Sequence, residues 1–388
     1  MGGTLKIVLK KIKRIIKMII YIVLGVILTL IILVTAFVNF SPQFGAKPKG
    51  ESLKRINISD NYKDGKFTNT KESIDEFPFS AYKNMISEMM RKRPDSTPPD
   101  RTLPEYNGEI KIKNQTNNSL TQITWLGHSA IFLKIDGYNL LIDPMLGDAY
   151  GPLTFMPKSQ RFGNSRPVTV KDLPKIDAVL ITHDHYDHLD YSTIKQLKGK
   201  VEHYFVPLGV AAHLKSWGVK EKIITKLDWW EEVEYKGMIL VATPAQHFSG
   251  RGLMDRFSTL WMSWVIKGGK HNIYFSGDSG YFDGFKQIGE KYGPFDLTMI
   301  ECGQYSEIWP HHHIFPEYTA QAHIDLKGKV LLPIHWGAFL LSPSHDWDEP
   351  IERLSKKAEE LNIQLTTPMI GQTVSLDTEY PDSKWWRN

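Results

Sequence analysis

The chain has 388 residues, of which 41% are hydrophobic and 23% charged, a composition typical of globular proteins rather than of disordered, collagen-like or disulfide-rich chains. Its net charge of +4 comes from residues 1–50, which hold eight Lys or Arg and no Asp or Glu, so that residues 51–388 sum to −4. This distribution argues against a basic nucleic-acid-binding face on the main body. Cys302 is the single cysteine, which excludes an intramolecular disulfide, and its apolar neighbours predict a buried thiol.

The first predicted element is a membrane-spanning helix. Residues 18–40 contain no charged side chain, and these 23 residues suffice for a bilayer core that needs ~20 helical residues. Six Lys or Arg precede them, which by the positive-inside rule places that end in the cytoplasm. We therefore predict a basic cytoplasmic tail (1–17), a single-pass anchor in the cell membrane (18–40) and a body on the outer side. A cleaved signal peptide is the alternative, but its apolar region is usually only about 7–15 residues long.

The polar residues 41–118 are predicted to form a stalk or cap, with a short helix within 72–90. Residues 119–375 are predicted to form the catalytic domain, followed by a C-terminal tail (376–388). Helical stretches at 191–197 and 351–361 alternate there with apolar runs, which predicts one α/β domain with sheets at its core. The runs expected as strands are 123–125, 130–135, 140–142, 178–181, 204–206, 239–242, 260–266, 273–275, 297–300 and 330–334.

Polar residues follow several of these strands at their ends. A sheet that delivers polar side chains from its strand ends to one edge is a common way to build a site. The runs 178–181, 239–242, 273–275 and 330–334 lead to His183, His247, Asp278 and His335, respectively.

The densest cluster of polar residues is the run 183–190, with three His and three Asp in eight positions. In a loop, His183 and His185 can converge on one ion, while Asp187 and His188 turn toward a second. Imidazole and carboxylate ligands suit Zn²⁺, with Fe and Mn as alternatives. A polar surface loop is the other interpretation of this run. Asp184 and Asp190, within it, are predicted to structure the loop or cap a helix.

The run has the His-x-His-x-Asp-His pattern and resembles the metallo-β-lactamase superfamily. This resemblance implies an αββα sandwich that holds two divalent ions, with zinc expected. It implies seven protein ligands: His183, His185 and His247 on one ion, Asp187, His188 and His335 on the other, and Asp278 bridging the two. Residues 124–129, 142–144, 185–190, 244–247, 260–264, 277–281 and 334–337 further resemble the branch of N-acyl-phosphatidylethanolamine-hydrolysing phospholipases D, although sugar-phosphate lactonases share some of these motifs.

In that phospholipase branch, a Gln-His pair before Pro-Glu helps to hold the substrate phosphate. Here His313 matches the His, and His312 replaces the Gln. The resemblance implies substrate contacts from His312, His313 and Tyr186, and catalytic roles for Asp187, Asp278 and His313. Two further residues are assigned from their context. Asp143 is predicted to lie behind a ligating His, with direct metal binding as the alternative, while His128 either faces the site or packs in the core.

The sequence therefore predicts a membrane-anchored, two-metal phosphodiesterase of phospholipase D type that acts on N-acyl-phosphatidylethanolamine or related lipids. A lactonase with the same metal chemistry is the alternative. A nuclease or a non-catalytic metal-binding protein is less favoured. The expected partners are the lipid bilayer and a phospholipid or ester substrate, and the charge of the body does not favour nucleic acid.

Overall fold

The computed structural model describes residues 2–70, 103–108, 112, 120–155, 159–252, 254–307, 309–341, 345–378 and 380–387, with Lys83 and Ser87 as isolated positions. Apart from Lys83 and Ser87, which are helical, the helix predicted within 72–90 lies outside the described residues. The chain divides into two compact units, Met1–Phe44 and Gly45–Asn388.

The first unit is a single long helix, α1 (Gly2–Phe40), followed by a short 3₁₀ turn, η1 (Pro42–Phe44). The ring of Phe37 packs edge-on against Phe44, at 5.4 Å between centroids. The portion Lys6–Phe40 is long and apolar enough to cross a membrane, with a mean hydropathy of 3.0 in its most apolar window. The helix starts well before the predicted span because Lys and Arg are good helix formers.

The second unit is built around two seven-stranded sheets. In the first sheet the strand order is β16-β3-β4-β5-β6-β7-β8, and in the second it is β15-β14-β13-β12-β11-β10-β9. The first sheet comprises β3 (Gln122–Trp125), β4 (Ile131–Ile135), β5 (Tyr138–Ile142), β6 (Ile176–Leu180), β7 (Val201–Pro207), β8 (Ile224–Leu227) and β16 (Thr373–Ser375). The second comprises β9 (Glu232–Tyr235), β10 (Met238–Thr243), β11 (Ser263–Lys267), β12 (Asn272–Phe275), β13 (Phe295–Glu301), β14 (Gly328–Ile334) and β15 (Gln364–Leu365).

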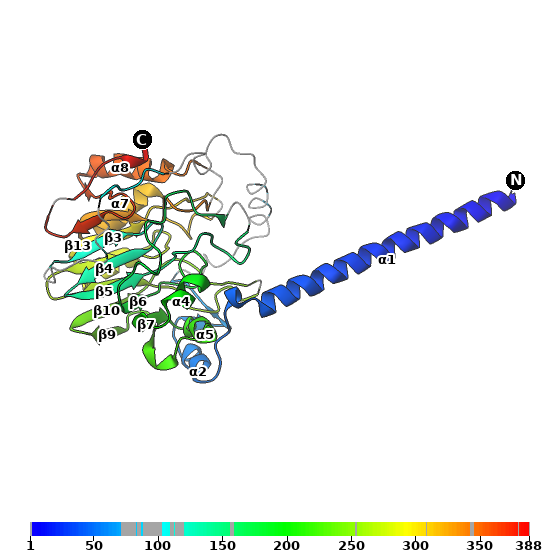
Figure 1. The fold of residues 1–388 in the computed structure, drawn as a ribbon, viewed down its shortest axis with the longest axis horizontal. Coiled ribbons are helices and arrows are strands. Elements are labelled where there is room, and N and C mark those ends of the chain that lie inside the picture. The colour runs from blue at the N-terminus through cyan, green and yellow to red at the C-terminus, as the bar shows by residue number, and fades with distance from the viewer. Residues whose placement is uncertain are drawn as a thin grey trace. The chain divides into compact units, whose positions relative to one another are not determined.

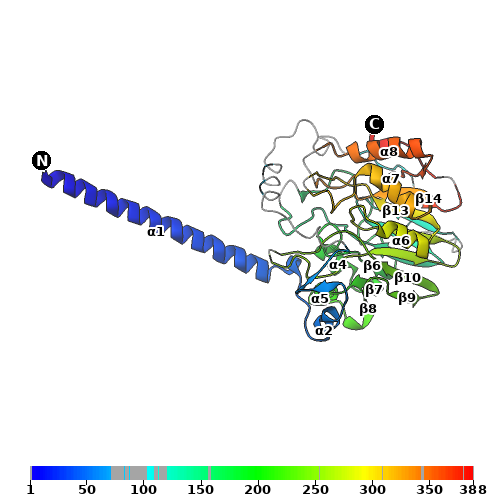
Figure 2. The ribbon, with the colours of Figure 1, turned by 180° about the vertical axis from the view of Figure 1, so that it is seen from behind.

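Helices cover the outer faces of the sheets. They are α4 (Tyr191–Leu197) and α5 (Ala211–Ser216), with the 3₁₀ turn η4 (Glu221–Ile223), and α6 (Gly284–Lys291), α7 (Pro316–Asp325) and α8 (Glu349–Leu361), with η5 (Trp385–Arg387) near the C-terminus. Figures 1 and 2 show α4 and α5 at one side of the sheets and α7 and α8 at the other.

Alternation along the strands explains these layers. In β4, Ile131 and Leu133 belong to the core between the two sheets, whereas Phe132 belongs to a second core that includes Ile194 of α4 and Leu214 of α5. Successive side chains of a strand point to opposite faces, so an all-apolar strand must be covered on both. The αββα sandwich implied by the resemblance is confirmed.

One predicted strand is shorter than expected. The run 260–266 becomes extended sheet only from Ser263. Leu260 and Met262 instead donate their backbone N–H groups to the carbonyl oxygens of Leu208 and Thr182, at 2.9 Å each. These residues join the second sheet to loops of the first, which is why they leave the ladder.

The compact unit begins with residues that the sequence analysis assigned to the extension 41–118. They form α2 (Glu51–Asn57) and the hairpin β1 (Tyr62–Lys63) and β2 (Lys66–Phe67). The backbone N–H of Phe67 donates to the carbonyl oxygen of Phe257 at 2.9 Å, and that of Ala46 donates to Nδ1 of His213 at 3.1 Å. Residues 45–69, hereafter the N-terminal brace, therefore contact a loop at Phe257 and helix α5 at His213, both far along the chain.

Candidate metal centre

The predicted ligands come from both sheets and meet at one edge. The run 183–188 follows β6 of the first sheet, while His247, Asp278 and His335 follow β10, β12 and β14 of the second. Asp190 caps α4, directly after the run, by accepting hydrogen bonds from the backbone N–H groups of Ser192 and Thr193. This confirms the capping role predicted for Asp190.

One set of imidazoles, His183, His185 and His247, is called the first group. Nδ1 of His185 lies 2.9 Å from Nε2 of His183 and 3.1 Å from Nε2 of His247. Oδ2 of Asp278 lies 3.8 Å from Nε2 of His183 and 3.7 Å from Nε2 of His247. These four ligand atoms all lie within 4.8 Å of one another, which is close enough to share one ion.

The other set, Asp187, His188 and His335, is called the second group. Oδ1 of Asp278 lies 3.0 Å from Nε2 of His188 and 3.1 Å from Nε2 of His335. Oδ2 of Asp187 lies 3.7 Å and 3.5 Å from the same two nitrogens. The carboxylate of Asp278 thus faces the first group with one oxygen and the second group with the other.

The buried atoms of the second group fit a cation. Within the described part of the chain, Nε2 of His188, Nε2 of His335 and Oδ1 of Asp278 make no hydrogen bond, although all three are buried. A buried polar atom without a partner costs about 1–3 kcal/mol. A divalent ion between these atoms would remove that cost, so the donor set fits a metal centre.

The pKa shifts of the buried groups also fit a cation between them. Burial would raise the pKa of Asp278, but the neighbouring His188 and His335 lower it well below its usual range. Burial lowers the pKa of His335, yet Asp278 and Asp187 overcome this effect and raise it to about 10. The two buried carboxylates therefore require positive charge at this point. Protons on imidazole supply it when no metal is present, and metal binding would displace them.

Asp143 links the outer nitrogens of both groups. Nδ1 of His188 lies 2.8 Å from Oδ2 of Asp143, to which the hydroxyl of Thr182 also donates at 2.6 Å. That hydroxyl oxygen lies 3.0 Å from Nδ1 of His183. Hydrogen bonds of this kind fix the tautomer and orientation of ligating imidazoles. Asp143 lies behind the ring of His188, as predicted, whereas Thr182 was not predicted to contribute.

His247 is held from two directions. Its Nδ1 donates to the carbonyl oxygen of His312 at 2.7 Å, which leaves Nε2 facing the centre. Its backbone exchanges two hydrogen bonds with the side chain of Asn69, at 2.8 and 3.1 Å. Asn69 also accepts from Nε1 of Trp261 at 3.1 Å. No motif in the sequence signalled Asn69, because it lies 178 residues before His247.

His128, for which the sequence left two interpretations open, faces the site. It is fully buried, its Nε2 lies 2.9 Å from Oδ2 of Asp187, and its ring packs on that of His335 at 4.1 Å. Burial lowers the pKa of His128 to about 3, so the ring is neutral. It therefore donates to Asp187 and orients this carboxylate toward the second group.

The residues predicted to contact substrate occupy three different environments. His313 is half-buried at the edge of the centre, with Nδ1 bonded to the buried carboxylate of Glu301. His312 is buried beside Phe248, where burial lowers the pKa of its ring to about 3. The hydroxyl of Tyr186 donates to the carbonyl oxygen of Arg251 at 2.7 Å. Glu301 was not predicted, although it ends an apolar strand as the ligands do.

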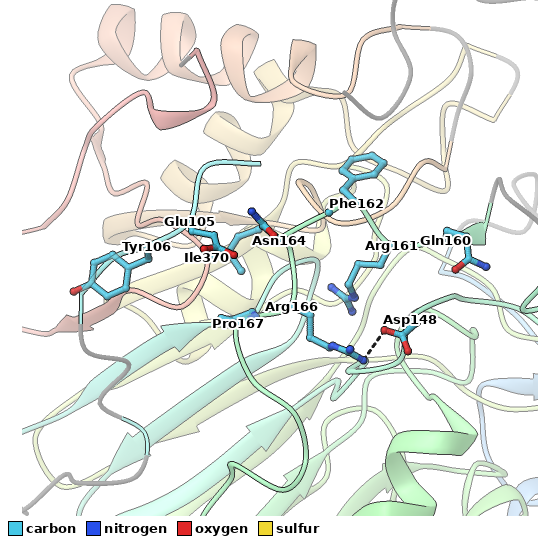
Figure 3. Close-up of a pocket in the computed structure, with 11 residues that line it drawn as sticks. Glu105, Tyr106, Asp148, Gln160, Arg161, Phe162, Asn164, Arg166, Pro167 and Ile370 are labelled. Atoms are coloured by element: carbon cyan, nitrogen blue, oxygen red, sulfur yellow. Dashed lines mark ion pairs between the residues drawn. The ribbon is translucent and has the colours of Figure 1, made fainter. Parts of the chain in front are cut away.

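The structure has a cavity of about 650 Å³, lined by residues that include Asp148, Phe162 and Arg166 (Figure 3). Its lining includes Arg161, whose guanidinium donates to three backbone carbonyls and packs over the ring of Phe339 at 4.4 Å. Phe339 in turn contacts the ring of His128 at 5.3 Å. None of the seven predicted ligands lines this cavity, so the chemistry of the centre is inferred from the ligand geometry.

Sequence comparisons agree with the fold. A family model described as the β-lactamase superfamily domain matches residues 138–336. An uncharacterized protein of Mycobacterium tuberculosis is 39% identical over 339 residues, which cover 85% of this chain and 88% of that protein. The N-acyl-phosphatidylethanolamine-hydrolyzing phospholipase D 1 of Caenorhabditis elegans is 34% identical over 271 residues, or 66% of this chain and 74% of that enzyme. The chain belongs to the β-lactamase superfamily, and within it to the metal-dependent hydrolases of the metallo-β-lactamase fold.

Solved structures support the fold alone. Igni18, a metallo hydrolase from the archaeon Ignicoccus hospitalis, superposes with a TM-score of 0.51 at 21% identity, over 67% of this chain and all of that one. An isothiocyanate hydrolase from Delia radicum gut bacteria superposes with a TM-score of 0.50 at 19% identity, over 65% of this chain and 98% of that one. One fold hosts several chemistries, so the substrate has to be argued from the site.

Proposed function

We propose that the chain is a phosphodiesterase of phospholipase D type that cleaves N-acyl-phosphatidylethanolamine or a related phospholipid. The observation that carries the proposal is the carboxylate of Asp278, whose two oxygens face two separate sets of ligand atoms. The first group would hold one divalent ion, the second group another, and Asp278 would bridge them, with Zn²⁺ as the expected metal. Similarity to the C. elegans phospholipase supports the choice of a phospholipid over other esters.

Individual residues of the chain would have separate roles in the proposed reaction. Two bound divalent ions would lower the pKa of a shared water toward ~7 and offset negative charge on the phosphoryl oxygens. Asp187 and Asp278 would orient that water, and their two negative charges leave the centre positive enough to attract a phosphodiester anion. His313, half-buried at the edge of the centre, would contact the phosphate, with His312 and Tyr186 shaping the surroundings.

The experiment is turnover of phospholipids by the full-length protein in vesicles, measured together with bound metal. We expect release of the headgroup amide from N-acyl-phosphatidylethanolamine, and a fall of at least about 1000-fold in Asp278→Ala, because both ions lose their shared ligand. Asp60→Ala, at an exposed carboxylate, is the matched control and should keep full activity. Turnover of lactones alone would leave the metal centre intact and reject the phosphodiester substrate.

The anchor is the second part of the proposal. α1 would cross the cell membrane with residues 1–17 in the cytoplasm, which would keep the catalytic unit at a surface where lipid substrate is concentrated. The sequence contains one cysteine, and Cys302 is buried, so an introduced cysteine can be labelled with little background. A membrane-impermeant maleimide should label Lys63→Cys on intact cells and Lys11→Cys only after permeabilisation. The reverse pattern would contradict the orientation.

A further inference from the structure

Glu301 is a buried acidic residue at the edge of the metal centre that belongs to neither ligand group. It is the last residue of β13 and is fully buried. Its backbone N–H donates to the hydroxyl of Ser276 at 2.9 Å, and its carbonyl accepts from the hydroxyl of Thr319 at 2.8 Å. The backbone is therefore held on both sides, and the carboxylate has little freedom to move.

The carboxylate of Glu301 has no Lys or Arg partner among the residues that the structure describes. Oε2 accepts the backbone N–H of Ser279 at 2.7 Å, and Oε1 accepts a hydrogen bond from Nδ1 of His313. The same oxygen lies 3.5 Å from Nδ1 of His335. A buried carboxylate is costly unless it is paired and hydrogen-bonded, so such a group is retained where its partners need it.

His313 is the partner whose orientation depends on this contact. It lies in the loop before α7, and its ring stacks on that of His335 at 5.3 Å. One of its ring nitrogens lies within 4.8 Å of ligand atoms of Asp278 and His335. The hydrogen bond made by one nitrogen of an imidazole decides which proton the other carries and where the other points. Because Nδ1 is engaged by Glu301, Nε2 is the nitrogen left for a substrate.

We propose that Glu301 is a positioning residue, which holds the ring of His313 so that Nε2 meets the phosphoryl group of the substrate. This inference rests on the proposed phosphodiesterase function. Glu301 acts through His313 and not through His335, because its bond to His313 is direct whereas Nδ1 of His335 lies 3.5 Å away. Without the carboxylate, the His313 ring would rotate and the substrate would lose an ordered contact.

The test is a double-mutant cycle in the full-length protein, with Glu301→Ala, His313→Ala and both together. We expect Glu301→Ala to lower kcat/KM about 10–100-fold, as loss of a partner behind a functional imidazole commonly does. In the His313→Ala background, Glu301→Ala should lower kcat/KM less than about 2-fold, since the residue that Glu301 positions is already absent. An undiminished effect in that background would overturn the proposal. If Glu301→Ala does not fold, Glu301→Leu, which fills a similar space without an acceptor, carries the same cycle.

Two measurements separate this role from others. Metal content should stay at that of the parent protein in every variant, and a loss of metal in Glu301→Ala would mean that Glu301 acts through His335. Affinity for inorganic phosphate, measured by calorimetry, should follow the same non-additive pattern as the rates. Glu352→Gln, on α8, is the matched control. If the parent protein cleaves no phospholipid, the proposed function fails, while phosphate binding still tests Glu301.

Discussion

The first and second groups both face the carboxylate of Asp278, but the outer nitrogens of their imidazole rings contact different kinds of chemical group. Behind the first group, the outer nitrogens of His183 and His247 meet a hydroxyl and a backbone carbonyl, both neutral. In the second group, Asp187 is itself charged, and Nδ1 of His188 meets the carboxylate of Asp143. A carboxylate behind a ligating His raises the basicity of the ligand. If each group binds an ion as proposed, the second group should hold its ion more tightly than the first.

Removal of Asp143 should have the largest effect on this comparison. Asp143→Ala deletes the partner of His188 and, through Thr182, the support of His183. We expect metal affinity to fall about 10–100-fold. Thr182→Val removes only the hydroxyl. It should lower metal affinity less than about 10-fold, and mainly in the first group. Metal content after dialysis against graded chelator measures both. Equal losses in the two variants would show that the hydroxyl matters as much as the carboxylate.

Graded chelation of the unaltered protein should separate the two ions. One equivalent of metal should be released at about 10-fold lower chelator concentration than the other. This corresponds to a difference of about 1.4 kcal/mol in binding free energy. His247→Ala, which damages the first group, should keep one tightly held ion. His335→Ala, which damages the second, should retain only weakly bound metal. Simultaneous loss of both ions from the parent protein would remove the proposed asymmetry.

The smallest effect is expected from the N-terminal brace. Asn69→Ala deletes the hydrogen bonds to the backbone of His247 and to Trp261, so the free energy of unfolding should fall by about 1–3 kcal/mol. Metal loss should be confined to the first group, which contains His247. Asn61→Ala is the matched control, because its amide bonds to Asp228 and to no ligand-bearing loop. Equal metal retention in the two variants would mean that the brace supports the fold but not the centre.

Features that depend on neighbouring residues, such as buried strands, could be predicted from the sequence. Buried strands such as β6 and β14 appear as short apolar runs, and predicted ligands follow their ends. Short or amphipathic elements were missed. β9, with its alternating Glu232, Val233, Glu234 and Tyr235, has too few apolar residues to stand out, and α7 begins at Pro316, whose neighbours were interpreted only as part of a substrate motif.

Support behind the ligands was harder to predict, because it depends on contacts between distant segments. Glu301 and His313 are 12 residues apart, but only the packing of β13 against the loop before α7 brings them together. Asn69 reaches His247 across 178 residues, and nothing near Asn69 marks it. His128 was left undecided because burial and a site contact are compatible, and the structure has both.

The position of the N-terminal brace has a consequence for how the protein is made. Residues 45–69 leave the ribosome early, yet their partners in the folded unit, His213, His247 and Phe257, are synthesised much later. At about 5–20 residues per second, the 178 residues between Asn69 and His247 take about 10–40 seconds to add. Throughout this interval Asn69 is without its partner His247. The N-terminal brace is thus translated well before the residues that it contacts, and it can dock only once they have been made.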